Sequence, residues 1–195
     1  MIDYIKGSLE ELSPTEAIIE CNGIGYSVLI SLQTYEGLYG KDNVHIYIHH
    51  YLREDEELYY GFSSKDERNL FRLLISVSGI GASTARMMLS SMNSDEIRNA
   101  IITEDVNKIK SIKGIGIKSA QRLILELKDK VVKSDEFNTS GIFAKIVNTS
   151  AEEASTALIM LGFNKSNVNK AIQTVLKNNP AASVEEIIKQ SLKIL

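Results

Sequence analysis

Two stretches near the middle of the chain, SVSGIGASTARMML (residues 76–89) and SIKGIGIKSAQRLI (residues 111–124), repeat each other at an offset of 35 residues. In each, an apolar run of helical period meets Gly-Ile-Gly, and a second helical run follows at once. Glycine permits positive φ angles and a close backbone approach, while a helix N-terminus presents unpaired N–H groups and a positive dipole end. The pattern therefore predicts helix, tight turn, helix, twice, with an anion site at each turn.

The residues predicted to bind the anion are the turn glycines and the polar residues beside them: Gly79, Gly81, Ser83, Gly114, Gly116, Lys118 and Arg122. Lys118 and Arg122 are spaced i, i+4, so they lie on one helix face and can flank one phosphate backbone. Phosphate contacts carry no base information, which predicts binding that depends on DNA structure and not on sequence. One Gly-Ile-Gly would fit a plain helix-hairpin turn equally well, but two copies in a basic segment favour phosphate binding.

Charge is segregated along the 195 residues, whose net charge is −3. Residues 1–62 carry 3 Lys and Arg against 11 Asp and Glu, residues 63–133 carry 13 against 8, and residues 134–195 carry 6 against 6. The basic excess of +5 coincides with the glycine turns, while the first segment has a net charge of −8. A weakly acidic total therefore does not exclude nucleic acid as a partner.

Enzyme motifs built on glycine do not fit these turns. A dinucleotide-binding Gly-x-Gly-x-x-Gly needs a preceding strand and a third glycine, whose place Thr84 and Ser119 occupy. No position matches the phosphate-binding P-loop, and neither His-Glu-x-x-His nor Gly-x-Ser-x-Gly occurs. We therefore expect no catalytic residue, no metal site and no cofactor, and we do not expect the chain to hydrolyse nucleotides itself.

Cysteine usage and hydropathy predict a cytoplasmic protein. Cys21 is the one cysteine, so the chain cannot form an internal disulfide, and its apolar strand pattern predicts a buried, inert thiol. The sequence MIDYIKGSLEEL lacks the features of a signal peptide. No stretch reaches the ~18 apolar residues that a membrane span requires.

The first 63 residues read as a small β-barrel. Runs at 16–20 and 26–31 flank a hairpin-like turn at Asn22-Gly23-Ile24-Gly25, and further strands are predicted at 43–51 and 58–62. Four or five short strands in about 60 residues match the OB-fold best. The third Gly-Ile-Gly of the chain lies in this strand turn, so the tripeptide alone does not predict a helix N-terminus.

Four consecutive acids, residues 54–57, follow Arg53 at a predicted loop tip. They form either an ordinary solvated hairpin loop or a projecting negative pin. His45 and His49 lie on one face of the preceding strand and His50 on the other, so strand histidines are favoured over a metal site.

The rest of the chain reads as helical. A capping-box pattern at 64–67 opens five helices that extend to residue 133 in two similar halves. Residues 134–149 are a candidate linker. Two further capping boxes, at 150–153 and 183–186, bracket three short helices over 150–195. In this last domain Leu161 and Phe163 place an apolar pair at a turn, where they either pack in the core or bind a partner.

Gly-Ile-Gly followed four residues later by alanine resembles the helix-hairpin-helix motif of DNA-binding proteins. Two such copies after a small β-domain and before a three-helix tail resemble the RuvA family, the bacterial subunits that bind Holliday junctions for branch migration. Arg53-Glu54-Asp55, the following Leu-Tyr-Tyr-Gly-Phe (58–62) and Leu-Lys-Asp-Lys (127–130) match that family's acidic pin, next strand and second motif. The resemblance covers essentially the whole chain.

The resemblance implies an α+β multidomain fold: an OB-fold barrel (1–63), a tandem helix-hairpin-helix domain (64–133), a linker (134–149) and a UBA-like three-helix domain (150–195). It implies a homotetramer, or an octamer of two tetramers, that holds four-way junction DNA open in recombination, DNA repair and the SOS response. Its partners would be the RuvB ATPase ring, bound through Leu161 and Phe163, and the RuvC resolvase. It also implies a nucleoid-associated protein of the bacterial cytoplasm.

The chain departs from the family at two positions. Ser83 stands where the family often has lysine, and Ile117 where it often has a basic residue. Both departures remove side-chain charge and leave backbone contacts intact, so we expect lower affinity or stronger salt sensitivity. Two other classes remain: a nuclease or glycosylase that uses the repeats only for docking, and a protein scaffold in which the glycines are purely structural.

Overall fold

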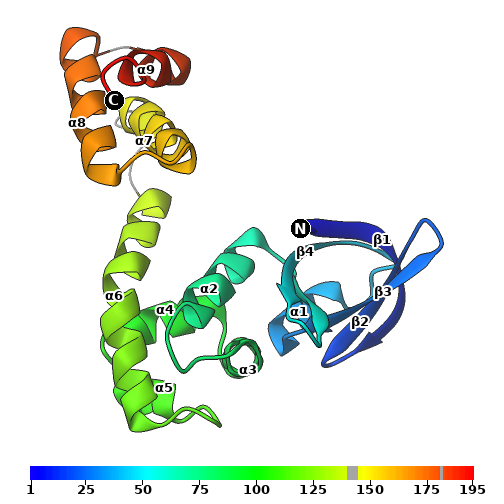
Figure 1. The fold of residues 1–195 in the computed structure, drawn as a ribbon. Coiled ribbons are helices and arrows are strands. Elements are labelled where there is room, and N and C mark those ends of the chain that lie inside the picture. Colours follow the sequence, from blue (N-terminus) through cyan, green and yellow to red (C-terminus); the bar gives the residue numbers. More distant parts are fainter. Residues whose placement is uncertain (140–144, 181) are drawn as a thin grey trace. The chain divides into compact units, whose positions relative to one another are not determined.

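The computed structural model describes residues 1–139, 145–180 and 182–195, with side chains for 1–131, 150–180 and 182–195 (Figure 1). The chain forms two compact units, Met1–Ser134 and Asp135–Leu195. The first unit holds the barrel and the glycine turns, and the second holds three helices. Residues 140–144, within the predicted linker, lie outside the described part.

Five strands close the barrel in the order β1-β2-β3-β5-β4. Their bounds are β1 (Tyr4–Ser13), β2 (Glu16–Cys21), β3 (Ile24–Ile30), β4 (Asn43–Leu52) and β5 (Glu57–Phe62). The four predicted strands are confirmed, and β1 and the helix α1 (Leu32–Leu38) are additions to the sequence prediction. The predicted turn after β2 is shorter than expected, because only Asn22 and Gly23 have positive φ (52° and 82°). Ile24 and Gly25 already pair with β2.

Alternating side chains of the strands fill the barrel. Ile19, Ile46 and Ile48 are fully buried in it, and Cys21 packs partly buried at its edge. Gly61 lets the strands close, since a Cβ there would lie 2.4 Å from atoms of Ile46 and Val28. The closure itself is short: β3 and β5 run parallel and pair at two positions, Leu29 with Tyr60 and Ile30 with Gly61.

The five predicted helices of the second domain are present, but the last one continues to Thr139, into the predicted linker. Their bounds are α2 (Lys65–Ile75), α3 (Ala82–Ser91), α4 (Ser94–Ile102), α5 (Val106–Lys110) and α6 (Ile117–Thr139). One apolar core holds these helices together and includes Tyr60 and Phe62 from β5, whose rings lie 5.3 Å and 4.9 Å from that of Phe71. The barrel and the helices of this unit therefore share a core.

A buried carboxylate joins the barrel to α2. Glu67 is fully buried, and it accepts hydrogen bonds from the hydroxyls of Ser31 (2.6 Å), Thr34 (2.8 Å) and Ser63 (3.1 Å) and from the Ser63 N–H (3.2 Å). The predicted capping box at 64–67 is thus only half present. The Ser64 hydroxyl accepts a hydrogen bond from the Glu67 N–H at 3.1 Å, as in a capping box. The Glu67 carboxylate, however, binds the three hydroxyls named above and not the Ser64 N–H. We name Glu67 with its three hydroxyl donors the Glu67 cradle.

Other polar contacts reinforce this joint. Arg68, the next residue on α2, donates to the Asp3 carbonyl (2.7 Å), the Asp3 carboxylate (2.6 Å) and the Ile48 carbonyl (3.2 Å). Three hydrogen bonds reach the following helices: Arg86 to the Thr15 carbonyl, the Leu32 N–H to the Ser90 hydroxyl, and the Ser94 N–H to the Gln33 side chain. The barrel and the glycine turns are therefore carried on one connected framework.

The second unit contains α7 (Lys145–Met160), α8 (Lys165–Asn178) and α9 (Val184–Ser191) around a small core of Leu158, Val168, Ile172 and Ile187. The capping box at Ser183 is confirmed, with both of its hydrogen bonds present. The one predicted at Ser150 is wrong, since α7 begins five residues earlier and Ser150 lies inside it. Ala and Glu are strong helix formers, so the SAEE pattern also fits a helix interior.

The Glu67 cradle generates a prediction for stability. Glu67→Ala leaves several buried donors without an acceptor, so the free energy of unfolding should fall by about 3 kcal/mol. Glu36→Ala, which removes an exposed carboxylate of α1, should change it by less than about 0.5 kcal/mol. Calorimetry at one fixed protein concentration compares the two. Equal effects of the two substitutions would contradict the role of the cradle.

Candidate nucleic-acid interface

The two glycine turns have the same backbone geometry. Gly79 and Gly114 both have a φ of +91°, a conformation that residues with a side chain rarely adopt. Each turn is then closed by two equivalent backbone hydrogen bonds. In the first turn the Ile80 N–H donates to the Val77 carbonyl (3.0 Å) and the Ala85 N–H to the Gly81 carbonyl (2.9 Å). In the second the Ile115 N–H donates to the Ile112 carbonyl (3.1 Å) and the Ala120 N–H to the Gly116 carbonyl (2.9 Å). The sequence repeat is therefore a structural repeat, as predicted.

Buried apolar residues anchor each turn. Val77, Ile80 and Ala85 of the first turn are at most 5% exposed, and so are Ile112, Ile115 and Ala120 of the second. The glycines between them stay exposed. This contrast fixes the turn backbone from the inside and leaves its outer face, with the first N–H groups of α3 and α6, open to a ligand.

Gly81 and Gly116 are glycines for which the fold gives no reason. Neither has a left-handed φ, and a Cβ built on either would have no atom within 4 Å. Gly81 is the N-cap of α3, where Ser, Asp or Asn would cap the helix better, and no side-chain cap is present. A glycine is useful at such a place when something outside the chain must approach the backbone closely.

The predicted polar residues surround these turns. Ser83 is exposed in the first turn of α3, Lys118 is exposed in the first turn of α6, and Ile117 beside it is 53% exposed. Arg122 lies one turn further along α6, where its Nε donates to the Glu126 carboxylate at 2.6 Å. This ion pair lies on the surface, so it competes only weakly with a phosphate.

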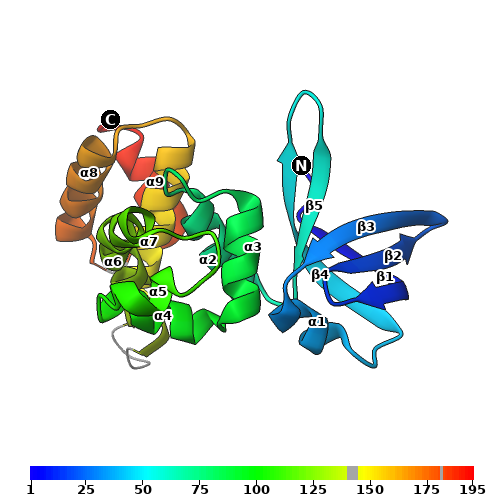
Figure 2. The same cartoon turned by 90° about the horizontal axis from the view of Figure 1, so that it is seen from below.

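The predicted acidic pin is the tip of the hairpin formed by β4 and β5. Figure 2 shows this hairpin extending beyond the other strands of the barrel. Its tip is closed by one hydrogen bond, from the Arg53 N–H to the Glu56 carbonyl at 2.8 Å. Glu54 and Asp55 are exposed at the tip. We call the three exposed acids of the tip, residues 54–56, the pin.

Glu57, the last of the four acids, belongs to the paired strands of the hairpin and not to its tip, since it pairs with Leu52. It begins β5 and accepts hydrogen bonds from the Tyr59 hydroxyl (2.7 Å) and from His50 (2.9 Å). The bond from Tyr59, and then the bond from His50, lower the pKa of the Glu57 carboxyl. The same contact raises the pKa of the Tyr59 hydroxyl. Three acids therefore remain at the free end.

The two candidate partner-binding residues of the second unit differ in environment. Gly162, with a φ of +97°, ends α7, and the Phe163 N–H donates back to the Leu158 carbonyl at 3.2 Å. Phe163 then packs partly buried against the small core. Leu161 is 64% exposed. Its neighbour Met160, which the sequence did not single out, is 85% exposed. Met160 is the last residue of α7.

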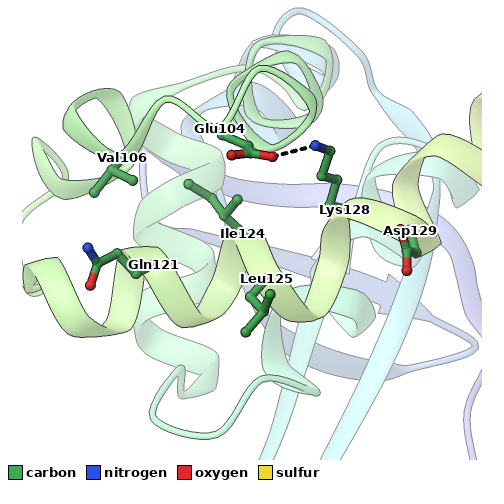
Figure 3. Close-up of a pocket in the computed structure, with 7 residues that line it drawn as sticks. All are labelled: Glu104, Val106, Gln121, Ile124, Leu125, Lys128 and Asp129. Atoms are coloured by element: carbon green, nitrogen blue, oxygen red, sulfur yellow. Dashed lines mark hydrogen bonds and ion pairs between the residues drawn. The ribbon is translucent and has the colours of Figure 1, made fainter.

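A pocket lies between α6 and the turn that precedes α5 (Figure 3). It is lined by Glu104, Val106, Gln121, Ile124, Leu125, Lys128 and Asp129. Its lysine is ion-paired with Glu104, and the bond to Lys128 lowers the pKa of the Glu104 carboxyl. A lysine held in an ion pair is a poor nucleophile, so the pocket gives no support to a glycosylase.

Within residues 1–131, 150–180 and 182–195, no group of three His, Cys, Asp or Glu side chains is placed to hold a metal ion. None of the helices in the described part is long and apolar enough to cross a membrane.

Comparison with known proteins gives matches along most of the chain. Residues 1–61 match the model of the RuvA N-terminal domain, residues 71–129 that of the SAM-like helix-hairpin-helix tandem, and residues 149–195 that of the RuvA C-terminal domain.

Relatives match over the full length of both chains. Proteins called Holliday junction branch migration complex subunit RuvA are 50% identical in Christiangramia forsetii over 195 residues, 49% in Bacteroides fragilis over 201 residues and 49% in Flavobacterium psychrophilum over 195 residues. Each alignment covers 100% of this chain and 100% of the relative. The matches to the three domain models confirm the predicted fold class. The chain belongs to the RuvA family.

Proposed function

We propose that this chain binds four-way DNA junctions, holds them open and delivers them to an ATP-driven motor for branch migration. Membership of the RuvA family supports junction binding and branch migration with RuvB. The observation that carries the DNA contact is the pair Gly81 and Gly116, which have room for a side chain and no internal need for glycine. Two such turns in one unit fit the repeating phosphates of a DNA backbone.

The turns bind mainly through backbone N–H groups. Charge from side chains is uneven: Lys118 follows the second turn, while Ser83 occupies the corresponding part of the first repeat. The second turn is therefore the stronger electrostatic contact, and the first relies on amides and the dipole of α3. Of the two effects expected from Ser83 and Ile117, lower affinity agrees with the loss of phosphate-binding cations, but the expected stronger salt sensitivity does not. Fewer such cations make the dependence of affinity on salt shallower, by about 0.9 in the log–log slope for each cation that is missing.

The pin acts by repulsion. Glu54 and Asp55 would stand beside phosphates at the crossover, where negative charge weakens binding, so affinity cannot be their purpose. We infer that the pins of a tetramer keep the strands apart at the centre and guide them as base pairs separate and re-form. Because these charges are exposed, salt screens their effect.

The assembly and partners follow the family resemblance. We infer a homotetramer, or an octamer of two tetramers, in the bacterial cytoplasm at the nucleoid. RuvB is the motor and RuvC a further partner. The chain itself is a non-catalytic subunit, since the ATPase activity of the complex lies in RuvB. Exposed Met160 and Leu161 form the motor-contact surface that we propose, with Phe163 supporting it from the core side.

One experiment separates this proposal from its rivals. Gel shifts with four-way, duplex and single-stranded DNA at two salt concentrations should show preference for the four-way junction. A scaffold protein would bind none of them. Incubation with Mg²⁺ and labelled junction should leave the DNA intact, and cleavage would establish a nuclease instead.

Gly116→Asp tests the glycine turn directly. An aspartate at a helix N-terminus stabilises the helix, so the fold should be retained. The same carboxylate would repel a phosphate at the turn, so junction affinity should fall at least tenfold, equivalent to about 1.4 kcal/mol. Melting temperature and gel-shift titration measure the two effects.

Gly116→Asn is the matched control for that variant, because it has nearly the same shape without the charge. It should reduce affinity less than Gly116→Asp does. Full affinity in the aspartate variant, with an intact fold, would mean that the turn does not touch DNA.

Replacing the pin charges should separate binding from migration. The double variant Glu54→Asn and Asp55→Asn removes repulsion from the crossover, so junction affinity should stay equal or increase by up to a few-fold. The rate of RuvB-driven branch migration should change in the same variant. Strand exchange on a labelled junction measures the rate, and a collapse of junction binding would rule out repulsion as the role of the pin.

The motor contact is tested on the second unit. Met160→Ser with Leu161→Ser alters exposed side chains only, so stability and junction binding should be retained while stimulation of RuvB by the junction complex is abolished. Phe163→Ala should instead lower the melting temperature of the second unit, because this ring packs on its core. Normal stimulation by the double variant would place the motor contact elsewhere.

A further inference from the structure

A second group of cations lies away from the glycine turns, where α2 packs against β4. Arg68 and Arg72 are one helical turn apart on α2, so they share a face. Phe71 lies between these two arginines in the sequence of α2. The ring of His49 on β4 lies 5.3 Å from the Phe71 ring. Side chains of β4 alternate, and Ile48 and its equivalents fill the barrel, so His49 points out of the barrel toward α2.

The charges in this place do not balance. Arg68 forms an ion pair with Asp3, although its buried Nε has no hydrogen-bond partner within the described part of the chain. Arg72, which is only partly exposed, makes neither a hydrogen bond nor an ion pair with any residue of the described chain. Burial, and then the charge of Arg68, lower the pKa of the Arg72 guanidinium. Burial, and then the charge of Arg72, likewise lower the pKa of His49. Among the described residues the local potential is therefore positive, and Asp3 alone offsets two guanidinium groups.

The same face of β4 leads to the pin. Tyr51 and Arg53 follow His49 at alternate positions, and the Arg53 guanidinium lies over the Tyr51 ring, 5.0 Å from its centroid. The distance from His49 to Arg53 is roughly 13 Å along an extended strand. Cations interleaved with aromatic rings are typical of surfaces that follow a nucleic-acid backbone. We call His49, Tyr51, Arg53 and Arg72 the β4–α2 stripe.

We propose that the β4–α2 stripe is a phosphate-binding site for the DNA strand that passes the pin, with Arg72 as its principal cation. This inference rests on the proposed junction binding. A guanidinium can grip a phosphate through two parallel hydrogen bonds, which suits a fixed position on a framework. The pin repels phosphates from the crossover, and the stripe beside its base attracts them. Together they define a path for the strand that neither charge could define alone.

The test compares Arg72→Gln with Lys41→Gln in the full-length protein. Both remove one positive charge, and Lys41 is exposed just before the opposite end of β4. Arg72→Gln should lower affinity for the four-way junction about five- to tenfold and reduce the salt slope by about 0.9 for each phosphate that the variant no longer binds. Affinity for linear duplex should stay within twofold, because the glycine turns are unchanged. Lys41→Gln should change neither affinity, and Arg72→Lys should keep most of the junction affinity.

Each other outcome has a definite meaning. If the unaltered protein prefers junctions but Arg72→Gln binds them with the same affinity and salt slope, the stripe is not a DNA site. If the unaltered protein shows no junction preference, the proposed function itself fails. If Arg72→Gln changes the oligomeric mass on a sizing column with light scattering, the anion for Arg72 is a carboxylate of a second copy of this chain, and the DNA site is overturned.

Discussion

The burial of one carboxylate governs how this protein presents itself to DNA. Glu67 is excluded from water between a barrel loop and the first helix of the DNA-binding domain, and four donors make that burial tolerable. The donors come from the barrel side and the acceptor from the helix, so neither side is complete without the other. The hairpin that carries the pin and the glycine turns are consequently held at a fixed separation, which a flexible linker could not achieve.

The proposed DNA contact uses the backbone, and it would explain the unusual composition of the turns. Gly79 and Gly114 satisfy the fold, because their φ of +91° excludes most other residues. The fold itself does not require glycine at positions 81 and 116, since a Cβ at either would have no atom within 4 Å, and the proposed DNA contact would account for both. A site built on amides loses little when neighbouring side chains change. The absence of a lysine at Ser83 is compatible with a working site for that reason.

The parts of the structure that were predictable from sequence have local signals. The turns repeat at a fixed offset, and the strand pairs and helices of the first unit follow their hydrophobic periods. β1 escaped prediction because a register shift between Leu9 and Glu11 breaks its alternation. The hydrogen bonding of Glu67 to the barrel was not predicted, because the sequence at 64–67 also fits a helix capping box. Its partner Ser31 lies 36 residues away in the chain. Arg72 carried no signal, since its isolation appears only when α2 meets β4. The contacts of the candidate sites with DNA and the motor remain predictions.

The closure of the barrel has a dynamic consequence. Only two residue pairs, Leu29 with Tyr60 and Ile30 with Gly61, connect β3 to β5, whereas the antiparallel neighbours pair at five or six positions. This seam is where the barrel opens with the fewest bonds broken, so its amide protons should exchange with solvent before those of β2. Gly61 of the seam also accepts from Thr34, a member of the Glu67 cradle, at 3.5 Å. The joint between the domains thus also fastens the one weak edge of the barrel.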